Sequence, residues 1–366
     1  MRKLFIALQL LLFTGFASST KILTSTNVFW GTDGGNVFPG VSVPFGMVKL
    51  GPEVRAGWQP TSGYRSDEPI VGFSHTRTSG TGGAPRYGNF LIVPQIDSMR
   101  LKELFKYTKL NEAGYPGYYT VTLKDKNSYI KAELTASQKV GYHRYTFTKK
   151  YSQTNALNAN ILIDVSNTLT RLTNNKPGTY WTDGYVKIVS STELQASITC
   201  EGGWGGLNPY TVYYYMEFDK PFTKAQLWRD GEFINRKELA TTNPEKLLKR
   251  FGAAVTFAGL SGMEVNCKVG LSFLSFEAAM LNLRSENNKS FEDALSTAEN
   301  LWLEKLNKIQ IKGGSVVAQQ LFRSALRNTM LMPTNVTGEV PGWNPNVPHY
   351  WDYYCIWDIF RATMPL

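Results

Sequence analysis

Hydrophobic and polar residues alternate in short runs from about residue 27 to residue 285. The runs are rich in Val, Ile, Tyr, Phe and Thr, and clusters of Gly, Asn, Asp and Pro separate them. Short runs of β-branched and aromatic residues between turn-forming residues are typical of β-strands. Clear examples are residues 117–123, 141–147, 160–165 and 210–218. Many short strands at this spacing predict a mainly β fold, either a sandwich or a barrel.

The hydrophobic pattern changes to helical spacing after residue 285. Ser290, with Asp293 three positions on, predicts a helix N-terminus, because the hydroxyl can accept a hydrogen bond from a free backbone N–H. Apolar residues then recur every three or four positions: Phe291, Leu295, Ala298, Trp302, Leu306 and Ile309. This period predicts an amphipathic helix that ends before Gly313-Gly314.

A second helix is expected from about Val316 to Met332, where Pro333 stops it. Residues 350–366 are aromatic and permit a third helix. Three helices cannot easily bury their apolar faces as a separate domain. Either they pack on the β domain, or the chain is the front part of a longer protein.

The first 19 residues have the three parts of a secretory signal peptide. Residues 1–3 carry positive charge, residues 4–16 are almost wholly apolar, and Ala17-Ser18-Ser19 offers small residues for cleavage. The alternative is a membrane anchor, but the apolar stretch is shorter than the roughly 20 residues that span a bilayer. We expect an exported protein, secreted or periplasmic, with no membrane span after signal cleavage.

Composition narrows the possible function classes. Hydrophobic residues make up 42% of the 366 residues and charged residues 19%, which excludes an intrinsically disordered protein. Three Cys exclude a four-Cys zinc site, and three dispersed His argue against a His-only metal site. The net charge is +10, but Lys and Arg are spread along the chain, which favours a solvated surface over nucleic-acid binding. In an exported protein two of Cys200, Cys267 and Cys355 can pair, and three buried free thiols are equally compatible with the sequence.

Residues of unusual type are concentrated between residues 27 and 94, where glycine-containing loops alternate with aromatic and short polar side chains. Trp58 follows Gly57 between Pro-containing loops, a position that does not suit a strand core. A flat ring flanked by polar groups suits a sugar, because the ring covers C–H groups while the polar groups bind hydroxyls. The alternative is an aromatic residue packed under loops, and the residues alone give the two equal weight.

Several blocks of residues have the order and spacing of a known enzyme family. They are Val28-Phe29-Trp30-Gly31-Thr32, Phe38-Pro39-Gly40-Val41-Ser42-Val43-Pro44-Phe45-Gly46-Met47, Gly57-Trp58, Ser62-Gly63-Tyr64, Gly72-Phe73-Ser74-His75-Thr76, Ser79-Gly80-Thr81-Gly82 and Trp357-Asp358-Ile359-Phe360-Arg361. Together they resemble glycoside hydrolase family 92, the exo-acting calcium-dependent α-mannosidases. The resemblance implies an N-terminal β-sandwich (supersandwich) over residues 20–285, a linker helix over 286–314, and the first helices of an incomplete (α/α)6 barrel over 315–366.

The resemblance also implies an activity, the inverting hydrolysis of terminal α-linked mannose, with α-1,2-linked mannosides of the N-glycan type as the expected substrate. Inversion needs one carboxylic acid that protonates the leaving oxygen and one carboxylate that activates water. In the family both groups, and the calcium ligands, come from barrel segments after the block that contains Asp358. We therefore expect the acid, the base and the calcium ligands beyond Leu366, and we expect the 366-residue chain to be inactive by itself.

Four residues of this chain are expected to bind sugar by the same resemblance. Trp58 corresponds to the tryptophan that flanks the sugar, and Asp358 to a carboxylate that accepts hydrogen bonds from sugar hydroxyls. Arg361, three residues further on, either orients Asp358 or binds the sugar, with a structural ion pair as an equal alternative. His75 lies in a matched block together with Arg77, and for both residues loop bracing is the favoured interpretation. The expected partners are mannose-containing glycans. The alternative function is that of a non-catalytic carbohydrate-binding protein.

Overall fold

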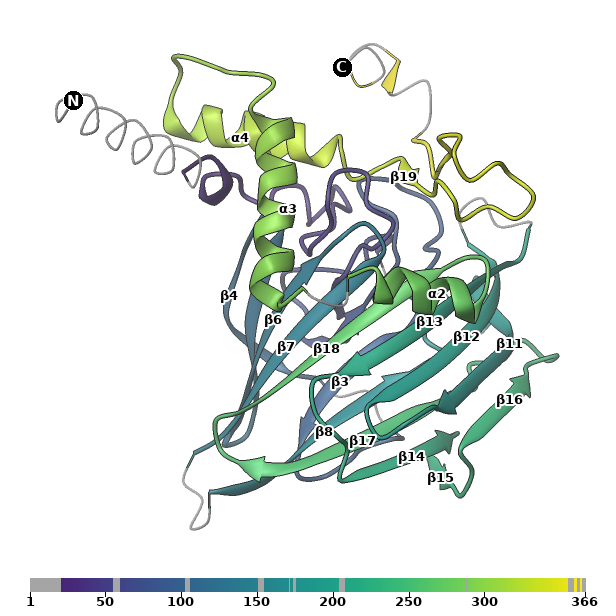
Figure 1. The fold of residues 1–366 in the computed structure, drawn as a ribbon. Coiled ribbons are helices and arrows are strands. Elements are labelled where there is room, and N and C mark those ends of the chain that lie inside the picture. Colours follow the sequence, from purple (N-terminus) through teal and green to yellow (C-terminus); the bar gives the residue numbers. More distant parts are fainter. Residues whose placement is uncertain are drawn as a thin grey trace, which may run out of the picture.

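Two antiparallel β-sheets that face each other form the main body of the computed structural model (Figure 1). The structure describes residues 21–54, 60–102, 106–150, 155–170, 172–173, 176–203, 208–286, 289–354, 359–360 and 363. The expected signal peptide therefore lies outside the described residues.

One sheet has seven strands and the other has nine. In spatial order the seven are β1 (Gly51–Val54), β2 (Ile70–Ser74), β3 (Leu91–Ile96), β8 (Ala156–Asp164), β17 (Phe251–Leu260), β14 (Lys224–Arg229) and β15 (Glu232–Ile234). The nine are β16 (Glu238–Thr242), β11 (Thr179–Ile188), β12 (Glu193–Gly202), β13 (Tyr210–Phe218), β18 (Met263–Ser272), β7 (Val140–Lys149), β6 (Ser128–Ala136), β5 (Tyr118–Asp125) and β4 (Thr108–Tyr115). Two short hairpins pair β9 (Leu172–Thr173) with β10 (Lys176–Pro177) and β19 (Thr334–Asn335) with β20 (Tyr350–Trp351).

The core lies between the inner faces of the two sheets. Buried and partly exposed residues alternate along β5 and β12, as the sequence pattern predicts for strands with one buried face. Phe73 of β2 contacts Tyr119 of β5 and Tyr145 of β7, with ring centroids 6.4 and 6.0 Å apart. Large aromatic side chains from both sheets thus fill the space between them. Of the two predicted architectures, the sandwich is confirmed and the barrel is not.

Three helices follow the last strand of the sandwich within the described residues: α2 (Phe276–Arg284), α3 (Phe291–Leu306) and α4 (Val316–Asn328). The predicted start of α3 is confirmed, since the Ser290 hydroxyl accepts from the backbone N–H of Asp293 and the Asp293 carboxylate accepts from the backbone N–H of Ser290. The predicted start of α4 at Val316 is confirmed too, but α4 ends at Asn328 rather than near Met332.

Helix α2 lies inside the range that the sequence pattern assigned to strands, so the sequence analysis missed it. Its beginning shares only the capping serine with α3: Ser275 precedes Phe276 as Ser290 precedes Phe291, but Ala278 stands where α3 has Asp293. The helix lies against the outer face of the nine-stranded sheet, where Ala279 and Leu283 pack beside Tyr215. Close approach is possible because Gly270 of β18 has no side chain at this contact.

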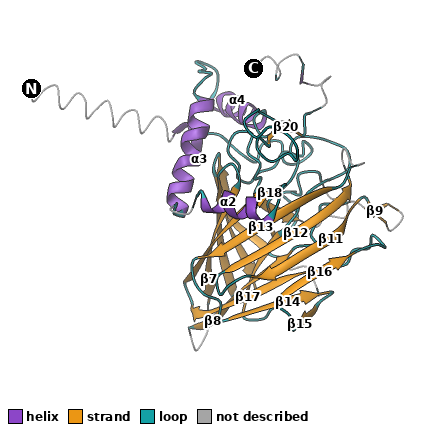
Figure 2. Ribbon diagram, turned by 45° about the vertical axis from the view of Figure 1, so that its right-hand side comes forward, coloured by secondary structure: helices purple, strands orange, loops and turns teal. Residues whose placement is uncertain are grey.

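Helix α3 stands beside the N-terminal loops and binds them through a buried tryptophan. Trp302 is fully buried with Phe38 and Leu306, and its indole N–H donates to the carbonyl oxygen of Ser42 at 2.7 Å. Figure 2 shows the helices at one end of the sandwich, above the ends of the strands. Of the predicted helices, α3 therefore packs on the β domain, which was one of the two predicted arrangements.

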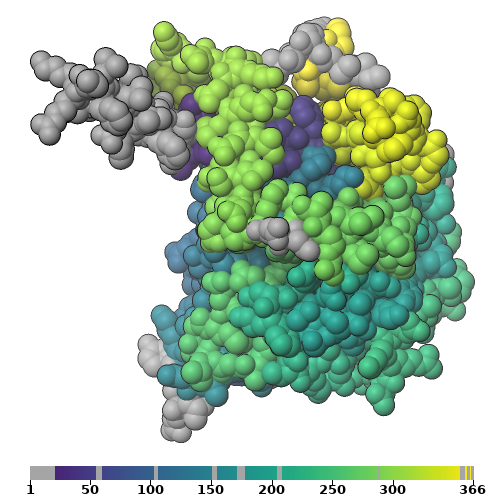
Figure 3. Space-filling model, viewed as in Figure 1, coloured from purple at the N-terminus to yellow at the C-terminus, as the bar shows by residue number. Residues whose placement is uncertain are grey.

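The chain after α4 runs back over the same end of the sandwich. In Figure 3 this yellow segment lies beside the purple and blue N-terminal loops. Backbone hydrogen bonds fix the contact: Phe45 donates its N–H to the carbonyl of Met330, and Asn335 donates to the carbonyl of Phe45. Segments almost 300 residues apart in the sequence (Figure 1) thus meet at the place where the candidate site lies.

Two of the three cysteines are buried free thiols, namely Cys200 and Cys267. Burial raises the pKa of Cys200 to about 12 and that of Cys267 well above its ordinary value, so both remain protonated. Cys355 lies outside the described residues.

Candidate sugar-binding site

Three of the four predicted sugar-binding residues, Trp58, Asp358 and Arg361, lie outside the described residues. Their roles therefore stay predictions. The described residues that flank these three positions nevertheless show which part of the molecule the three segments border.

His75, the fourth predicted residue, lies in the interior of the sandwich. Its Nδ1 is 2.9 Å from the carbonyl oxygen of Phe90, and its Nε2 is 2.9 Å from Nε2 of His143. A carbonyl oxygen can only accept, so Nδ1 of His75 carries the hydrogen and its Nε2 accepts one from His143. On the far side of the pair, the Tyr145 hydroxyl donates to Nδ1 of His143 at 2.8 Å.

This chain of hydrogen bonds uses every ring nitrogen of both histidines. Burial lowers the pKa of His75 to about 3 and the pKa of His143 well below its ordinary value, so both rings are neutral. No nitrogen of His75 is left for a sugar hydroxyl. The structure does not support sugar binding by His75, and it fits the bracing role that the sequence analysis favoured.

Arg77 also braces the loops. Its guanidinium is fully buried and donates to the carbonyl oxygens of Gly51, Pro52 and Ser62 at 2.8 Å each. It donates further to the carbonyl and hydroxyl oxygens of Ser74. Burial lowers the pKa of Arg77 to about 10, so the group still carries its charge near neutral pH. Arg77 therefore joins β1, β2 and the loop between them.

A hollow of about 400 Å³ lies where the glycine-rich loop after β2 meets α4 and the segment after β20. It is lined by Gly35, Val37, Gly80, Thr81, Gly82, Asn328, Thr329, Tyr354, Ile359 and Thr363. Gly80 has a φ of +67°, and the Tyr354 hydroxyl would be only 3.6 Å from a Cβ at this position. Gly82 faces open space. The glycine cluster thus lets the loop turn tightly and leaves room on its open side.

The segments that carry the predicted sugar-binding residues border this hollow. Thr61 follows Trp58 by three residues, and its hydroxyl donates to the carbonyl oxygen of Thr81 in the lining at 2.6 Å. On the opposite side Ile359 lines the hollow and directly follows Asp358, while Thr363 follows Arg361 by two residues. The fold therefore brings the flanks of all three predicted residues to one place, although more than 290 residues separate Thr61 from Ile359.

A buried polar network behind the hollow holds the segment after β20 in place. The Tyr87 hydroxyl lies 3.0 Å from both carboxylate oxygens of Asp352 and donates to them. Asp352 has a φ of +59° and stands two residues before Tyr354 of the lining. Burial raises the pKa of Asp352, although the positive charges of Lys49 and Arg86 act in the opposite direction.

Lys49 is a buried cation near Asp352. Its ammonium group donates to the carbonyl of Gly46 at 2.9 Å and to the Thr334 hydroxyl at 2.6 Å. Burial lowers its pKa to about 8, while the Asp352 charge acts to raise it. The sequence analysis assigned no role to these residues, because nothing in their local pattern shows that residues 49, 87 and 352 meet.

Glu339 is a further buried carboxylate at this end of the molecule, and its oxygens are saturated. It accepts from Lys139 at 2.7 Å, from the Ser272 hydroxyl at 2.5 Å and from the backbone N–H of Phe273 at 3.0 Å. Asn282 of α2 donates to it as well, at 2.8 Å. A carboxylate held by four donors ties α2 and β18 to the chain after β19, and this is a structural task.

Comparison with known proteins decides the family. The family model of the glycosyl hydrolase family 92 N-terminal domain matches residues 25–272, and that of the family 92 catalytic domain matches residues 278–366. The chain belongs to glycoside hydrolase family 92. Helices α3 and α4 and the segment that borders the hollow fall in the catalytic-domain match, so the hollow lies between the two matched family 92 domains.

Solved family 92 structures have the same fold. A family 92 α-mannosidase from Bacteroides thetaiotaomicron is 24% identical and superposes with a TM-score of 0.80 over 94% of this chain and 47% of that chain. It has also been solved in complex with mannoimidazole. A family 92 inverting mannosidase from the same organism is 21% identical, with a TM-score of 0.72 over 93% of this chain and 45% of that chain.

A curated relative, an uncharacterized secreted glycosidase of Arthroderma benhamiae, is 28% identical over 358 residues, which is 90% of this chain and 44% of the relative. The chain thus spans about half the length of the relatives that it matches. Within the described residues, none of the helices combines the length and the apolar character needed to cross a bilayer.

The calcium expected for family 92 finds no ligand cluster in the described part of this chain. No group of three or more His, Cys, Asp or Glu side chains among the described residues is arranged to hold a metal ion. The buried carboxylate of Glu339 is already saturated by protein donors, and Tyr87 holds Asp352. The described residues therefore offer no cluster of acidic side chains for calcium.

Proposed function

We propose that this chain supplies the sugar-binding wall of a glycosidase that removes terminal α-linked mannose with inversion. The observation that carries the proposal is the hollow between the two matched family 92 domains, which the flanks of Trp58, Asp358 and Arg361 border. The solved relatives support the proposal, since one is named an inverting mannosidase and another was solved in complex with mannoimidazole.

In the proposed site Trp58 covers the C–H face of the sugar and Asp358 accepts hydrogen bonds from two of its hydroxyls. Arg361 holds the Asp358 carboxylate or donates to the sugar. The lining supplies an open glycine loop on one side and the half-buried side chains of Tyr354 and Asn328 on the other. Its described residues include no Asp or Glu, which suits binding more than proton transfer.

The reaction needs an acid and a base about 6.5–9.5 Å apart with room for a water molecule between them. We propose that both, and the calcium ligands, belong to the half of the relatives that this chain does not span. The expected substrate is an α-1,2-linked mannoside of the N-glycan type. Export to the cell exterior or the periplasm is part of the proposal, and the name of the fungal relative, a secreted glycosidase, supports it.

A calorimetric titration of the chain with mannoimidazole tests the proposal. We expect millimolar or tighter affinity, about −4 kcal/mol or more favourable, and we expect Trp58→Ala and Asp358→Asn each to abolish it. Trp343→Ala is the matched control, because Trp343 is 48% exposed and does not line the hollow. Absence of binding to the unaltered chain contradicts the sugar-binding role.

A parallel assay separates the enzymatic proposal from its alternative. We expect the 366-residue chain to release no mannose from an α-1,2-mannobioside, with or without calcium. Calcium-dependent release by this chain shows that the acid, the base and the metal ligands lie within it, which contradicts their proposed location. Sugar binding by a natural protein of only this length favours the alternative function, a non-catalytic carbohydrate-binding protein.

A further inference from the structure

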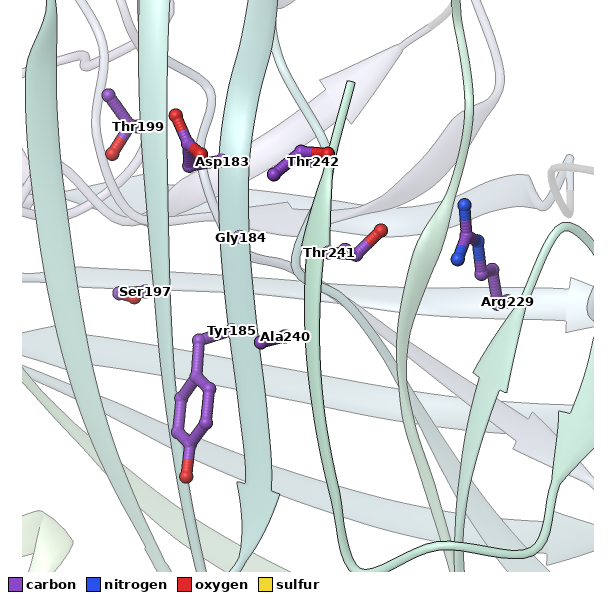
Figure 4. A pocket seen from close by; sticks show the side chains of 9 residues that line it. All are labelled: Asp183, Gly184, Tyr185, Ser197, Thr199, Arg229, Ala240, Thr241 and Thr242. Carbon is purple, nitrogen blue, oxygen red and sulfur yellow. The ribbon is translucent and has the colours of Figure 1, made fainter. Parts of the chain in front are cut away.

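A second polar groove lies on the sandwich itself, across neighbouring strands β16, β11 and β12 (Figure 4). Its volume is about 490 Å³, and it is lined by Asp183, Gly184, Tyr185, Ser197, Thr199, Arg229, Ala240, Thr241 and Thr242. It shares no lining residue with the hollow described above. In Figure 1 these strands lie away from α4 and β19, near which the hollow is found.

The strand register places six of the nine lining residues in two rows on one face of the sheet. Gly184 and Thr241 alternate to the opposite face, and Arg229 belongs to β14 of the seven-stranded sheet. Asp183 of β11 pairs with Thr199 of β12 and with Thr242 of β16, so one carboxylate stands between two hydroxyls. Two residues further along β11, Tyr185 pairs with Ser197 and Ala240. Residues i and i+2 of a strand share a face, so both rows point the same way, as Figure 4 shows.

An irregularity of β11 sets the position of Asp183. The register between β11 and β12 shifts between Trp181 and Asp183, which inserts Thr182 as an extra residue. A bulge of this kind changes the face on which the following side chains lie. Buried Trp181 faces the core, and after the shift Asp183 and Tyr185 share the opposite, outward face.

The polar groups in the rows are mostly free to bind a ligand. Among the described residues, the Asp183 carboxylate has neither an ion-pair nor a hydrogen-bond partner, in a chain whose net charge is +10. The hydroxyls of Ser197 and Thr242 have no side-chain hydrogen bond to another described residue.

An aromatic wall bounds the second row. The Tyr185 ring lies 5.3 Å from that of Phe276, the first residue of α2, and its hydroxyl donates to Glu238 at 3.0 Å. The ring is thereby fixed while part of it stays exposed. A fixed ring next to a free carboxylate and several hydroxyls is the combination that binds a neutral sugar: the ring packs against C–H groups, and the carboxylate accepts from adjacent hydroxyls.

We propose that this face of β16, β11 and β12 is a second carbohydrate-binding site, which takes a neutral oligosaccharide through Asp183 and Tyr185. Its residues are independent of Trp58, Asp358 and Arg361, so the proposal does not rest on the function proposed for the hollow.

Titration of the chain with an α-1,2-linked mannotriose tests this site, with Trp58→Ala as the background so that binding at the hollow is removed. We expect residual binding in this background, and we expect Asp183→Ala to weaken it by roughly tenfold or more, as loss of a hydrogen bond to a charged group does. Tyr185→Ala is expected to weaken it as well. The matched control is Glu304→Ala, which removes a carboxylate that is 59% exposed on α3.

Thermal unfolding of each variant shows whether it is folded, and Asp183→Ala is expected to unfold at the parent temperature because its carboxylate has no partner among the described residues. Hydrogen exchange of residues 183–199 in the Trp58→Ala background is expected to slow when mannotriose is added. Equal affinity of the Trp58→Ala chain with and without Asp183→Ala overturns the groove proposal. Loss of all mannotriose binding in the Trp58→Ala chain also overturns the groove proposal.

Discussion

His75 and His143 face each other inside the sandwich with their Nε2 atoms 2.9 Å apart. His75 directly follows β2 of the seven-stranded sheet, and His143 belongs to β7 of the nine-stranded sheet, so the contact joins the two sheets. It can form only while one Nε2 carries a hydrogen and the other does not, and a proton added to the accepting nitrogen breaks it. Two buried neutral rings thus connect the sandwich, and this has consequences for stability in acid.

We expect the free energy of unfolding to fall as the pH is lowered from 7 to 4. In the folded state the pKa of His75 is about 3 and that of His143 is well below 6.5, so neither ring binds a proton in this range. In the unfolded chain both rings bind one below about pH 6.5, so acid favours unfolding. Each histidine contributes a slope of about 1.4 kcal/mol per pH unit. Urea unfolding at several pH values measures the slope of the unfolding free energy against pH.

A matched pair of variants isolates this contribution from that of other groups. The glutamine of His143→Gln can still donate to His75 and accept from Tyr145, but it does not titrate. We therefore expect the unfolding free energy of this variant to depend less on pH, by the slope that the uptake of one proton contributes. His349→Gln is the control, since His349 lies at the surface beside Trp343. If His143→Gln leaves the slope of unfolding free energy against pH unchanged, the histidine pair does not set the stability in acid.

The hydrogen positions on the two rings form a second prediction. The carbonyl oxygen of Phe90 can only accept a hydrogen bond, so His75 carries its hydrogen on Nδ1. The contact between the two rings then requires His143 to carry its hydrogen on Nε2. Imidazole nitrogen chemical shifts in a two-dimensional NMR spectrum distinguish nitrogens that carry hydrogen from those that do not. We expect one fixed tautomer for each ring. A hydrogen on Nε2 of His75 contradicts the assignment.

The Tyr87–Asp352 contact is expected to stabilise the wall of the hollow. Tyr87→Phe removes the hydroxyl that donates to both oxygens of a largely buried carboxylate, so we expect a loss of about 1–3 kcal/mol of unfolding free energy. Hydrogen exchange in residues 334–354 is expected to become faster.

Tyr353→Phe serves as its control. Tyr353 is 48% exposed, stands next to Asp352 in sequence, and has no side-chain hydrogen bond to any residue that the structure describes. We expect this variant to keep the parent stability. Equal stability of the Tyr87→Phe and parent chains would show that the contact does not hold the segment.

Removal of the N-terminal cap is expected to weaken α3. Ser290→Ala deletes the hydroxyl that accepts from the Asp293 N–H, which costs roughly 1 kcal/mol at such positions. Ser296→Ala changes an exposed serine in the middle of the same helix and is expected to be neutral or slightly stabilising, because Ala is the better helix former. Thermal unfolding compares the two. A larger loss for Ser296→Ala contradicts the capping interpretation.

Local sequence patterns predicted much of the fold. The strands around residues 117–123 and 210–218 are rich in β-branched and aromatic residues, and this composition is visible in the sequence. The starts of α3 and α4 were predictable because a capping serine marks each of them. Helix α2 was missed although Ser275 caps it in the same way, because a nine-residue helix directly after a strand offers little periodicity.

Contacts between distant residues could not be predicted. His143 is 68 residues from His75, and Asp352 is 265 residues from Tyr87, so no local pattern pairs them. The row of Thr199, Asp183 and Thr242 follows from the register of three strands and from a bulge in one of them. By contrast, the resemblance in the sequence blocks pointed to Trp58, Asp358 and Arg361, whose flanking residues the fold brings to one hollow.

The most direct test of the sugar-binding role is hydrogen exchange of the chain with and without mannoimidazole. We predict slower exchange in residues 60–64, 76–87 and 350–363, which include or border the hollow, and we predict that Trp58→Ala removes this protection. Unchanged exchange in all three segments at saturating mannoimidazole, or protection that persists in Trp58→Ala, would contradict the account.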